Sequence, residues 1–300
     1  MAKEQLKGHL ALAGAYLIFG LNIVTCKDFT NSGLVPPMAL FSLRAFGASL
    51  LFWLVSAFMP RERVEKSDAW RIAVASIVGL FIPQVTFLFA LTMSTAIDTA
   101  IVGTMLPIFT MFFAAVAVKE PISFKKAFGV GVAFAGVVFL ILNTFHAAGN
   151  VEHTTPLGMA LLIINSISFG AYYGVFRPLI SKYSVVTFMK WMFLVSLIVS
   201  LPFSFRELLQ VNLLAIPGKL MGEMLFLIIF ATFVAYFLIP FGQKRLRPTV
   251  STMYSYLQPI IATIVAVITG LDIITWQKIV AIVLVIFGVF LVNRSRAAGQ

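Results

Sequence analysis

Long apolar runs alternate with short polar connections along the whole chain. A helix needs about 20 mostly apolar residues to cross a bilayer, and ten runs meet this requirement. They cover residues 8–26, 36–59, 70–91, 97–117, 124–143, 157–177, 185–204, 220–241, 248–269 and 275–293. The pattern predicts an all-α membrane protein with ten transmembrane helices and no separate soluble domain.

One stretch of this pattern occurs twice, 152 positions apart. An apolar run around Pro107 is followed by an acidic residue in a connection, and the same arrangement recurs around Pro259. A duplicated unit of five helices explains the spacing, with residues 1–148 and 155–300 as the two copies. Because five crossings leave the chain on the opposite side of the membrane, the second copy is inverted. Inverted repeats are typical of transporters, whose two halves exchange conformations around one central site.

Most of the 22 Lys and Arg residues lie in connections on the same side as the N-terminus. Basic residues are enriched in the cytoplasmic connections of membrane proteins. We therefore expect both termini in the cytoplasm and the connection of residues 146–156 outside. We expect a multi-pass protein of a bacterial inner membrane, in contact with the lipid bilayer.

The composition fits a bilayer, with 60% apolar and 11% charged residues. Soluble domains carry about 25% charged residues. The net charge of +11 comes from basic clusters between apolar runs, as in membrane anchors, so we expect no nucleic-acid partner. A single cysteine, Cys26, excludes an internal disulfide, and three isolated histidines predict no metal site. We expect no cofactor.

Several short motifs of the chain resemble those of a known transporter family. They are Phe19-Gly20-Leu21-Asn22, Leu43-Arg44, Pro107 followed by Glu120, and the glycine-spaced run 124–143. With the two repeats, these motifs resemble the ten-helix EamA-type exporters of the drug/metabolite transporter superfamily. Phe19 departs from the tryptophan that the family usually has there. The resemblance implies a carrier of a small molecule, such as an amino acid, metabolite or drug, with a central cavity lined by both halves.

Polar side chains inside apolar runs need partners, because hydrocarbon offers no hydrogen bonds. The predicted substrate-binding residues are positions that carry a non-aliphatic side chain in both copies. Two further candidates are added to them. They are Asn22 with Tyr172, Gln84 with Tyr236, Thr104 with Tyr256, and also Trp191 and Gln258. Such residues also hold neighbouring helices together, and tyrosines lie at membrane interfaces, so a packing role is the alternative.

Arg44 also lies inside an apolar run, about eight residues from its start. At 1.5 Å per residue this is a depth of ~12 Å, too far for its side chain to reach the outer headgroups comfortably. A cavity-facing arginine binds a carboxylate or phosphate through two parallel hydrogen bonds. Alternatively, Arg44 bonds to helix carbonyls and only shapes the bundle.

Pro107 and Pro259 each remove one helical hydrogen bond and bend their helix. Their recurrence in both copies favours a role as hinges, and a simple packing kink is the alternative.

The acids Asp98 and Glu223 lie just inside the outer ends of their runs and are candidates for protonation. With no acid at the membrane midplane, the sequence favours a carrier with weak or no proton coupling.

Small residues in the run 124–143 predict close helix packing, and they could also form the face of a homodimer.

Three other functions compete with a transporter. A passive channel would show charge rings or carbonyl filters, and an intramembrane enzyme would need a nucleophile or metal at depth. A purely structural membrane protein would not need paired internal polar positions.

Overall fold

The computed structural model describes residues 2–94, 99, 102–145, 155–268 and 276–294. Every regular element in these ranges is a helix. Six helices, some built from joined segments, are long and apolar enough to cross a membrane. They are Lys3–Asn31, Pro37–Ala57, Lys66–Leu91, Pro156–Val175, Val185–Gln210 and Gly218–Gln243. The all-helical membrane fold is confirmed, and the full count of ten spans stays a prediction.

The first half of the chain contains α1 (Ala2–Asn31), α2 (Pro37–Ala57), α3 (Lys66–Ser76), the π-helical turn η1 (Ile77–Phe81), α4 (Ile82–Leu91), α6 (Leu106–Ala117) and α7 (Phe124–Phe145). The second half contains α8 (Pro156–Val175), α9 (Arg177–Lys182), α10 (Val185–Gln210), the 3₁₀ turn η2 (Leu213–Ala215), α11 (Gly218–Ile228), the π-helical turn η3 (Ile229–Val234), α12 (Ala235–Gln243), α13 (Pro248–Thr252), the 3₁₀ turn η4 (Met253–Tyr256), α14 (Leu257–Ile268) and α15 (Trp276–Asn293).

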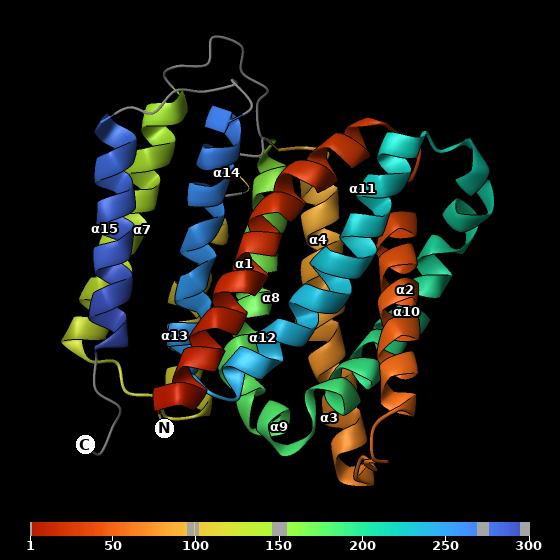
Figure 1. Ribbon diagram of the computed structural model, residues 1–300, viewed down its shortest axis with the longest axis horizontal. Helices are drawn as coiled ribbons and strands as arrows, with labels where there is room; N and C mark the ends of the chain where they lie inside the picture. Colours follow the sequence, from red (N-terminus) through yellow and green to blue (C-terminus); the bar gives the residue numbers. More distant parts are fainter. Residues whose placement is uncertain (1, 95–98, 100–101, 146–154, 269–275, 295–300) are drawn as a thin grey trace.

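The two halves run through the molecule in opposite directions. In Figure 1, α1 starts at the bottom and rises, whereas α8 starts at the top and descends. The helix contacts follow the same relation: α1 packs on α12 and α14, and α8 packs on α4 and α6. Two further pairs, α2 with α10 and α7 with α15, each join equivalent helices and form the two ends of the bundle.

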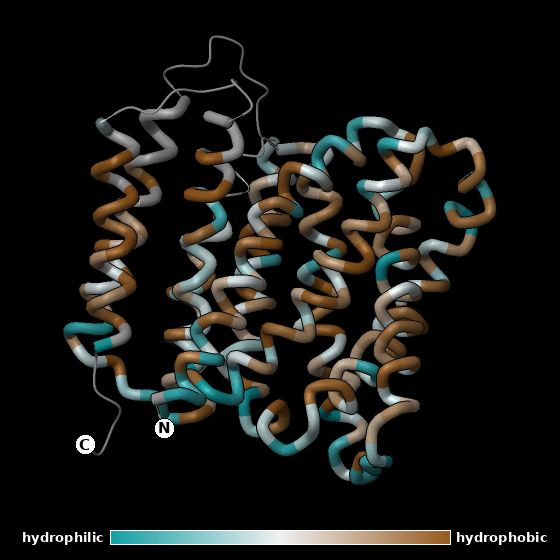
Figure 2. Tube along the Cα trace, in the orientation of Figure 1, coloured by the Kyte–Doolittle hydropathy of each residue, from teal (hydrophilic) through white to brown (hydrophobic). Residues whose placement is uncertain are grey.

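Apolar residues cover the outer surface along the helices. Figure 2 shows brown positions along the middle of the helices, with teal positions concentrated toward their upper and lower ends. Large exposed side chains such as Phe46, Leu50 and Phe112 lie on this surface. Their exposure fits a bilayer, in which lipid tails replace water around the helices.

The two π-helical turns occupy equivalent places in the two halves. The first begins at Ile77 and the second at Ile229, again 152 positions apart. A π turn bonds each N–H to the carbonyl five residues back, which widens the helix locally. Both turns lie midway along their long helices, and each is followed within two residues by a lining residue of the cavity described below, Pro83 and Tyr236.

Pro107 and Pro259 lie at helix starts, not in the middle of continuous helices. The run 97–117 was expected to form one bent helix, but α6 begins only at Leu106, so Pro107 falls in its first turn. In the second half, a 3₁₀ turn separates α13 from α14, and Pro259 follows the break. Proline is tolerated in a first turn because the N–H it lacks would have no helical partner there. The hinge function of both residues stays a prediction.

Glycines bring α7 and α15 into close contact within the chain. A Cβ atom added to Gly129 would lie 2.8 Å from the Gly288 carbonyl oxygen, and one added to Gly288 would lie 2.5 Å from the Gly129 oxygen. This close approach requires glycine at both positions. Gly129 therefore serves intramolecular packing, whereas Gly131 of the same run is exposed with no atom within 4 Å of an added Cβ. The homodimer stays a prediction.

Candidate functional site

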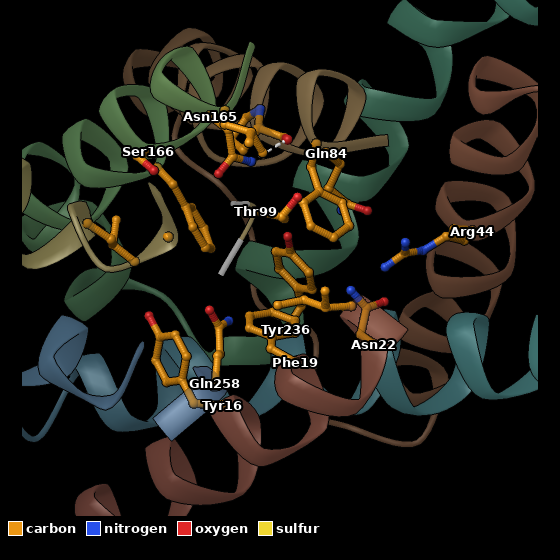
Figure 3. Close-up of a pocket in the computed structure, with 17 residues that line it drawn as sticks. Tyr16, Phe19, Asn22, Arg44, Gln84, Thr99, Asn165, Ser166, Tyr236 and Gln258 are labelled. Atoms are coloured by element: carbon orange, nitrogen blue, oxygen red, sulfur yellow. Dashed lines mark hydrogen bonds between the residues drawn. The ribbon is translucent and has the colours of Figure 1, made fainter. Parts of the chain in front are cut away.

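A cavity of about 90 Å³ lies inside the bundle, lined mainly by α1, α4 and α8. Its walls are completed by Arg44 of α2, Thr99, Gly103, Leu106 of α6, Tyr236 of α12 and Gln258 of α14 (Figure 3). Both halves of the chain contribute to it.

Equivalent residues of the two halves face the same cavity. Gln84 and Tyr236 are 152 positions apart and both line it, and Leu106 and Gln258 have the same spacing. In α1 and α8 the spacing is 150 positions, which pairs Tyr16 with Ser166 and Phe19 with Phe169. The cavity therefore lies where the two repeats meet.

Aromatic rings form one wall of the cavity. The ring centroids of Phe19 and Tyr236 are 5.6 Å apart at a steep angle, and Tyr16 meets Phe19 in an edge arrangement at 5.8 Å. Phe169 lies 6.4 Å from Tyr236. Edge-to-face contacts at these distances stabilise ring positions beyond simple burial. The wall is thereby fixed in shape and offers an apolar surface to a ligand.

Arg44 is the charged group of the cavity, and its side chain is buried. Its Nε donates to the Thr232 hydroxyl at 2.9 Å, and its Nη1 donates to the Cys26 sulfur at 3.4 Å. Cys26 in turn donates to the Asn22 side-chain oxygen at 3.5 Å. No carboxylate in the described ranges forms an ion pair with Arg44. The guanidinium is held by neutral groups.

The π turn η3 places the main partner of Arg44. The Thr232 hydroxyl donates to the Leu227 carbonyl five residues back, at 2.6 Å, while it accepts the hydrogen bond from Arg44. One hydroxyl therefore satisfies a helix carbonyl and a buried cation together. The local widening of the helix positions the arginine.

The equivalent π turn η1 is connected to α8 by neutral hydrogen bonds. Pro83 has no N–H, so the Val78 carbonyl lacks the donor that a residue five positions later would supply. Ser168 fills this gap by donating to the Val78 oxygen at 2.7 Å. Asn165 donates from its amide to the Pro83 carbonyl at 2.6 Å. These bonds fix the face of α8 that lines the cavity.

Gln84 is a polar residue of the cavity whose hydrogen bonds are unused. Both polar atoms of its amide are buried, and neither has a hydrogen-bond partner among the described residues. The amide approaches the Tyr236 hydroxyl without making a hydrogen bond. A buried amide without partners is costly. A ligand in the cavity would supply the missing partners.

A family model matches both halves of the chain. The model of the EamA-like transporter family covers residues 6–142 and again residues 156–294. The chain belongs to the EamA-like transporter family. The resemblance to the drug/metabolite transporter superfamily and the presence of two repeats are thereby confirmed.

Relatives of this EamA-family protein extend over nearly its whole length. It is 22% identical over 293 residues to an uncharacterized transporter of Archaeoglobus fulgidus, covering 97% of this chain and 100% of that protein. It is 23% identical to the uncharacterized transporter YetK of Bacillus subtilis, over 97% of this chain and 88% of that protein. A solved structure shares the fold with a TM-score of 0.74 at 17% identity, over 97% of this chain and 96% of the other. The EamA-family chain is therefore a membrane transporter.

Five of the predicted substrate-binding residues lie around the cavity of this EamA-family transporter. They are Asn22, Arg44, Gln84, Tyr236 and Gln258. Recurrence in the repeat predicted Asn22, Gln84 and Tyr236, and the position next to the central proline predicted Gln258. Arg44 was predicted from its depth in an apolar run.

Four other predicted residues do not line this cavity. Tyr172 packs against Gly79 and Phe169, and the Tyr256 hydroxyl donates to the Val130 carbonyl at 3.4 Å. Trp191 meets another indole ring, that of α2, at 5.3 Å. Thr104 is fully buried outside the lining. Any role of these four in binding stays a prediction.

The two candidates for protonation differ in what the structure describes. Asp98 lies outside the described residues. Glu223 lies in the middle of α11, one turn after Lys219. The Lys219 ammonium contacts the Glu223 carboxylate at 3.4 Å and the Asp28 carboxylate at 2.5 Å. Glu223 does not line the cavity. Proton coupling stays a prediction.

Several residues that line the cavity were not predicted from the sequence. They are Tyr16, Phe19, Thr99, Asn165 and Ser166, with the apolar residues around them. The 150-position spacing of α1 and α8 pairs Tyr16 with Ser166, so the test for polar positions in both copies would have selected this pair. Asn165 has Ala15 as its equivalent and gives no such signal.

Proposed function

We propose that the protein is a secondary carrier that moves a small organic molecule across the membrane by alternating access. The observation that carries this proposal is the cavity formed by equivalent residues of the two repeats. Two inverted halves can exchange conformations, and the exchange moves the opening of a shared site from one face to the other. A passive channel needs no such paired site and is the main alternative.

We propose that contacts on the lower face of Figure 1 act as one gate. The Ser184 backbone N–H is shared between the two carboxylate oxygens of Glu62, at 3.0 and 3.1 Å. Lys182 contacts Asp68 and Glu65 at 2.7 Å each. These hydrogen bonds raise the pKa of the Lys182 ammonium, so it stays charged at neutral pH. The contacts tie the connection after α2 to the segment around α9.

Contacts at the opposite face would form the second gate. Glu207 near the end of α10 accepts from the Ala39 backbone N–H at 2.9 Å, at the start of α2. Lys219 of α11 pairs with Asp28 of α1. Because the repeats are inverted, a carrier is expected to open these contacts when those at the lower face close. We assign the lower face to the cytoplasm, from the positive-inside distribution. We propose export as the direction, which the resemblance of the sequence motifs to EamA-type exporters implies.

Counterflow in proteoliposomes separates a carrier from a channel. Purified protein is reconstituted, and labelled amino acids and carboxylates are offered one at a time outside vesicles loaded with the same unlabelled compound. A carrier accumulates label transiently above equilibrium, because the loaded substrate returns the site to the outside. Saturable uptake with this overshoot supports the proposal. Uptake that is linear in concentration and lacks the overshoot would identify a channel.

A further inference from the structure

We propose that the cavity selects a small monocarboxylate, with its carboxylate on Arg44 and its apolar body against the aromatic wall. This inference rests on the carrier function proposed above. Figure 3 shows the guanidinium pointing from α2 into the cavity, toward Asn22 and Tyr236.

The charge of the cavity is the first reason for a monoanion. Among the described residues that line it, Arg44 is the one charged side chain. A buried charge is strongly destabilising unless a counter-charge and hydrogen bonds compensate it. Thr232 and Cys26 supply two hydrogen bonds but no negative charge. A bound carboxylate supplies the missing charge.

The geometry of the guanidinium favours a carboxylate. A guanidinium carries five N–H donors in a planar fork, and two of its hydrogen bonds go to Thr232 and Cys26. The planar fork matches a carboxylate through paired hydrogen bonds. A phosphate dianion would leave one negative charge uncompensated. A zwitterion would place its ammonium among neutral groups, since the described lining contains no acid.

The rest of the cavity selects the body of the ligand. Phe19, Phe169 and Tyr236 present ring faces and edges to an apolar chain. Gln84 adds an amide without hydrogen bonds, which suits a hydroxyl or carbonyl substituent. The cavity has a volume of about 90 Å³ inside the bundle, which favours a small ligand.

The competing explanation is that Arg44 only joins α2 to the second half. Its bond to Thr232 connects α2 with η3, and a purely structural arginine needs no ligand. Lys190 provides the matched control, because it is a second cation within an apolar helix, bonded to Ser56 at 2.7 Å and away from the cavity. Loss of its charge leaves the cavity intact.

The test compares four probes of similar size on purified protein by titration calorimetry. They are butanoate, its amide butanamide, butylammonium and the zwitterion 2-aminobutanoate. We expect butanoate to bind at least about tenfold more tightly than butanamide, the difference that one charge-assisted pair makes. Arg44→Gln should reduce this preference to within about twofold, and Lys190→Gln should keep it in full. Arg44→Lys should bind butanoate more weakly than the wild type does. It should bind butanamide as tightly as the wild type does.

Several results would overturn the monocarboxylate assignment. One is wild-type protein that binds no butanoate, or binds any of the other three probes as tightly. Another is Arg44→Gln protein that keeps the preference or, where that variant does not fold, Arg44→Lys protein with unchanged butanoate affinity. Asp98 lies outside the described residues, so Asp98→Asn is included. A tenfold gain of butanoate affinity in this variant would mean that an acid already neutralises the cavity.

Counterflow of labelled butanoate, with protein-free vesicles as the background, separates this inference from the carrier function. Selective binding of butanoate without overshoot would remove the carrier function and leave the anion site. Overshoot with amines or neutral compounds, but not with butanoate, would remove the monocarboxylate and leave the carrier. Overshoot with butanoate that Arg44→Gln abolishes and Lys190→Gln retains supports both.

Discussion

The two π turns have the same backbone form but different polar partners. At η1, a proline leaves the Val78 carbonyl without a helical donor, and Ser168 of α8 supplies a neutral one. At η3, Thr232 satisfies the Leu227 carbonyl of its own helix and accepts from Arg44 of α2. The repeats therefore share a backbone device, while the charge is placed beside one of them only. Symmetry creates the cavity, and the side chains that break symmetry give it chemical selectivity.

Substitution of the equivalent residues Gln84 and Tyr236 should give the largest difference in the stability of the protein. Tyr236→Ala removes a ring that contacts Phe19 and Phe193, each at a centroid distance of 5.6 Å. Loss of a large buried ring costs about 3–5 kcal/mol of unfolding free energy. We expect a clear drop in the melting temperature of the purified variant. Tyr236→Phe keeps the ring and should melt close to the wild type; a wild-type melting temperature for Tyr236→Ala would contradict the packed wall.

The two π turns should respond differently to loss of their hydroxyl groups. Thr232→Val keeps the shape but removes the donor to Leu227 and the acceptor of Arg44, so we expect a loss of about 2–3 kcal/mol. Ser168→Ala removes one neutral bond to Val78 and should cost about 1–2 kcal/mol. Thermal unfolding of both variants measures the difference. Equal losses would mean that the charge at η3 adds nothing to its stability.

Equivalent small residues inside the π turns provide a third comparison. A Cβ atom on Gly79 of η1 would lie 2.3 Å from a ring carbon of Tyr172, whereas the equivalent residue of η3 is Ala231. Overpacking of this kind costs about 1–3 kcal/mol, so Gly79→Ala should be destabilising. Ala231→Gly should cost only about 0.5–1 kcal/mol through helix entropy.

The double variant Gly79→Ala with Tyr172→Leu tests the cause of that destabilisation. If the clash with the ring is responsible, the smaller side chain should recover part of the loss, and the two changes will not be additive. Additive losses in the melting experiments would mean that Gly79 is needed for another reason.

The sequence was sufficient for the repeat and for part of the site. The spacing of apolar runs predicted the membrane helices, and the spacing of prolines predicted two copies, which the family match confirms. Polar residues recurring in both copies included Gln84 and Tyr236, which meet at the cavity. When the same position is polar in both halves, one cause can explain both residues, and a shared cavity that both line is such a cause.

The remaining features depend on tertiary contacts. The segment Ile77–Phe81 is uniformly apolar apart from one glycine, so no polar pattern marked its π turn. Tyr256 satisfies the repeat criterion, but its hydroxyl bonds to the Val130 carbonyl of α7, a partner that only the folded bundle supplies. Pro107 lies in the first turn of α6 because a turn at Thr104 and Met105 interrupts the helix, which its sequence position alone does not reveal.

The smallest stability effect is expected at Gln84, the counterpart of Tyr236. Its amide is buried without hydrogen bonds among the described residues, so Gln84→Ala removes polar atoms that stabilise nothing in the unliganded protein. The lost methylene packing and the relieved amide oppose each other, and we expect a net change within about 1 kcal/mol. The melting temperature should stay near that of the wild type.

Transport by the same variant should nevertheless fall about tenfold or more, because the amide serves the bound molecule. Gln243, on α12 and away from the cavity, also has a buried amide without hydrogen bonds among the described residues, and Gln243→Ala is the matched control. We expect it to melt and transport like the wild type. If Gln84→Ala loses folded protein in proportion to activity, Gln84 holds helices together; if neither variant changes transport, the amide lies outside the path of the substrate.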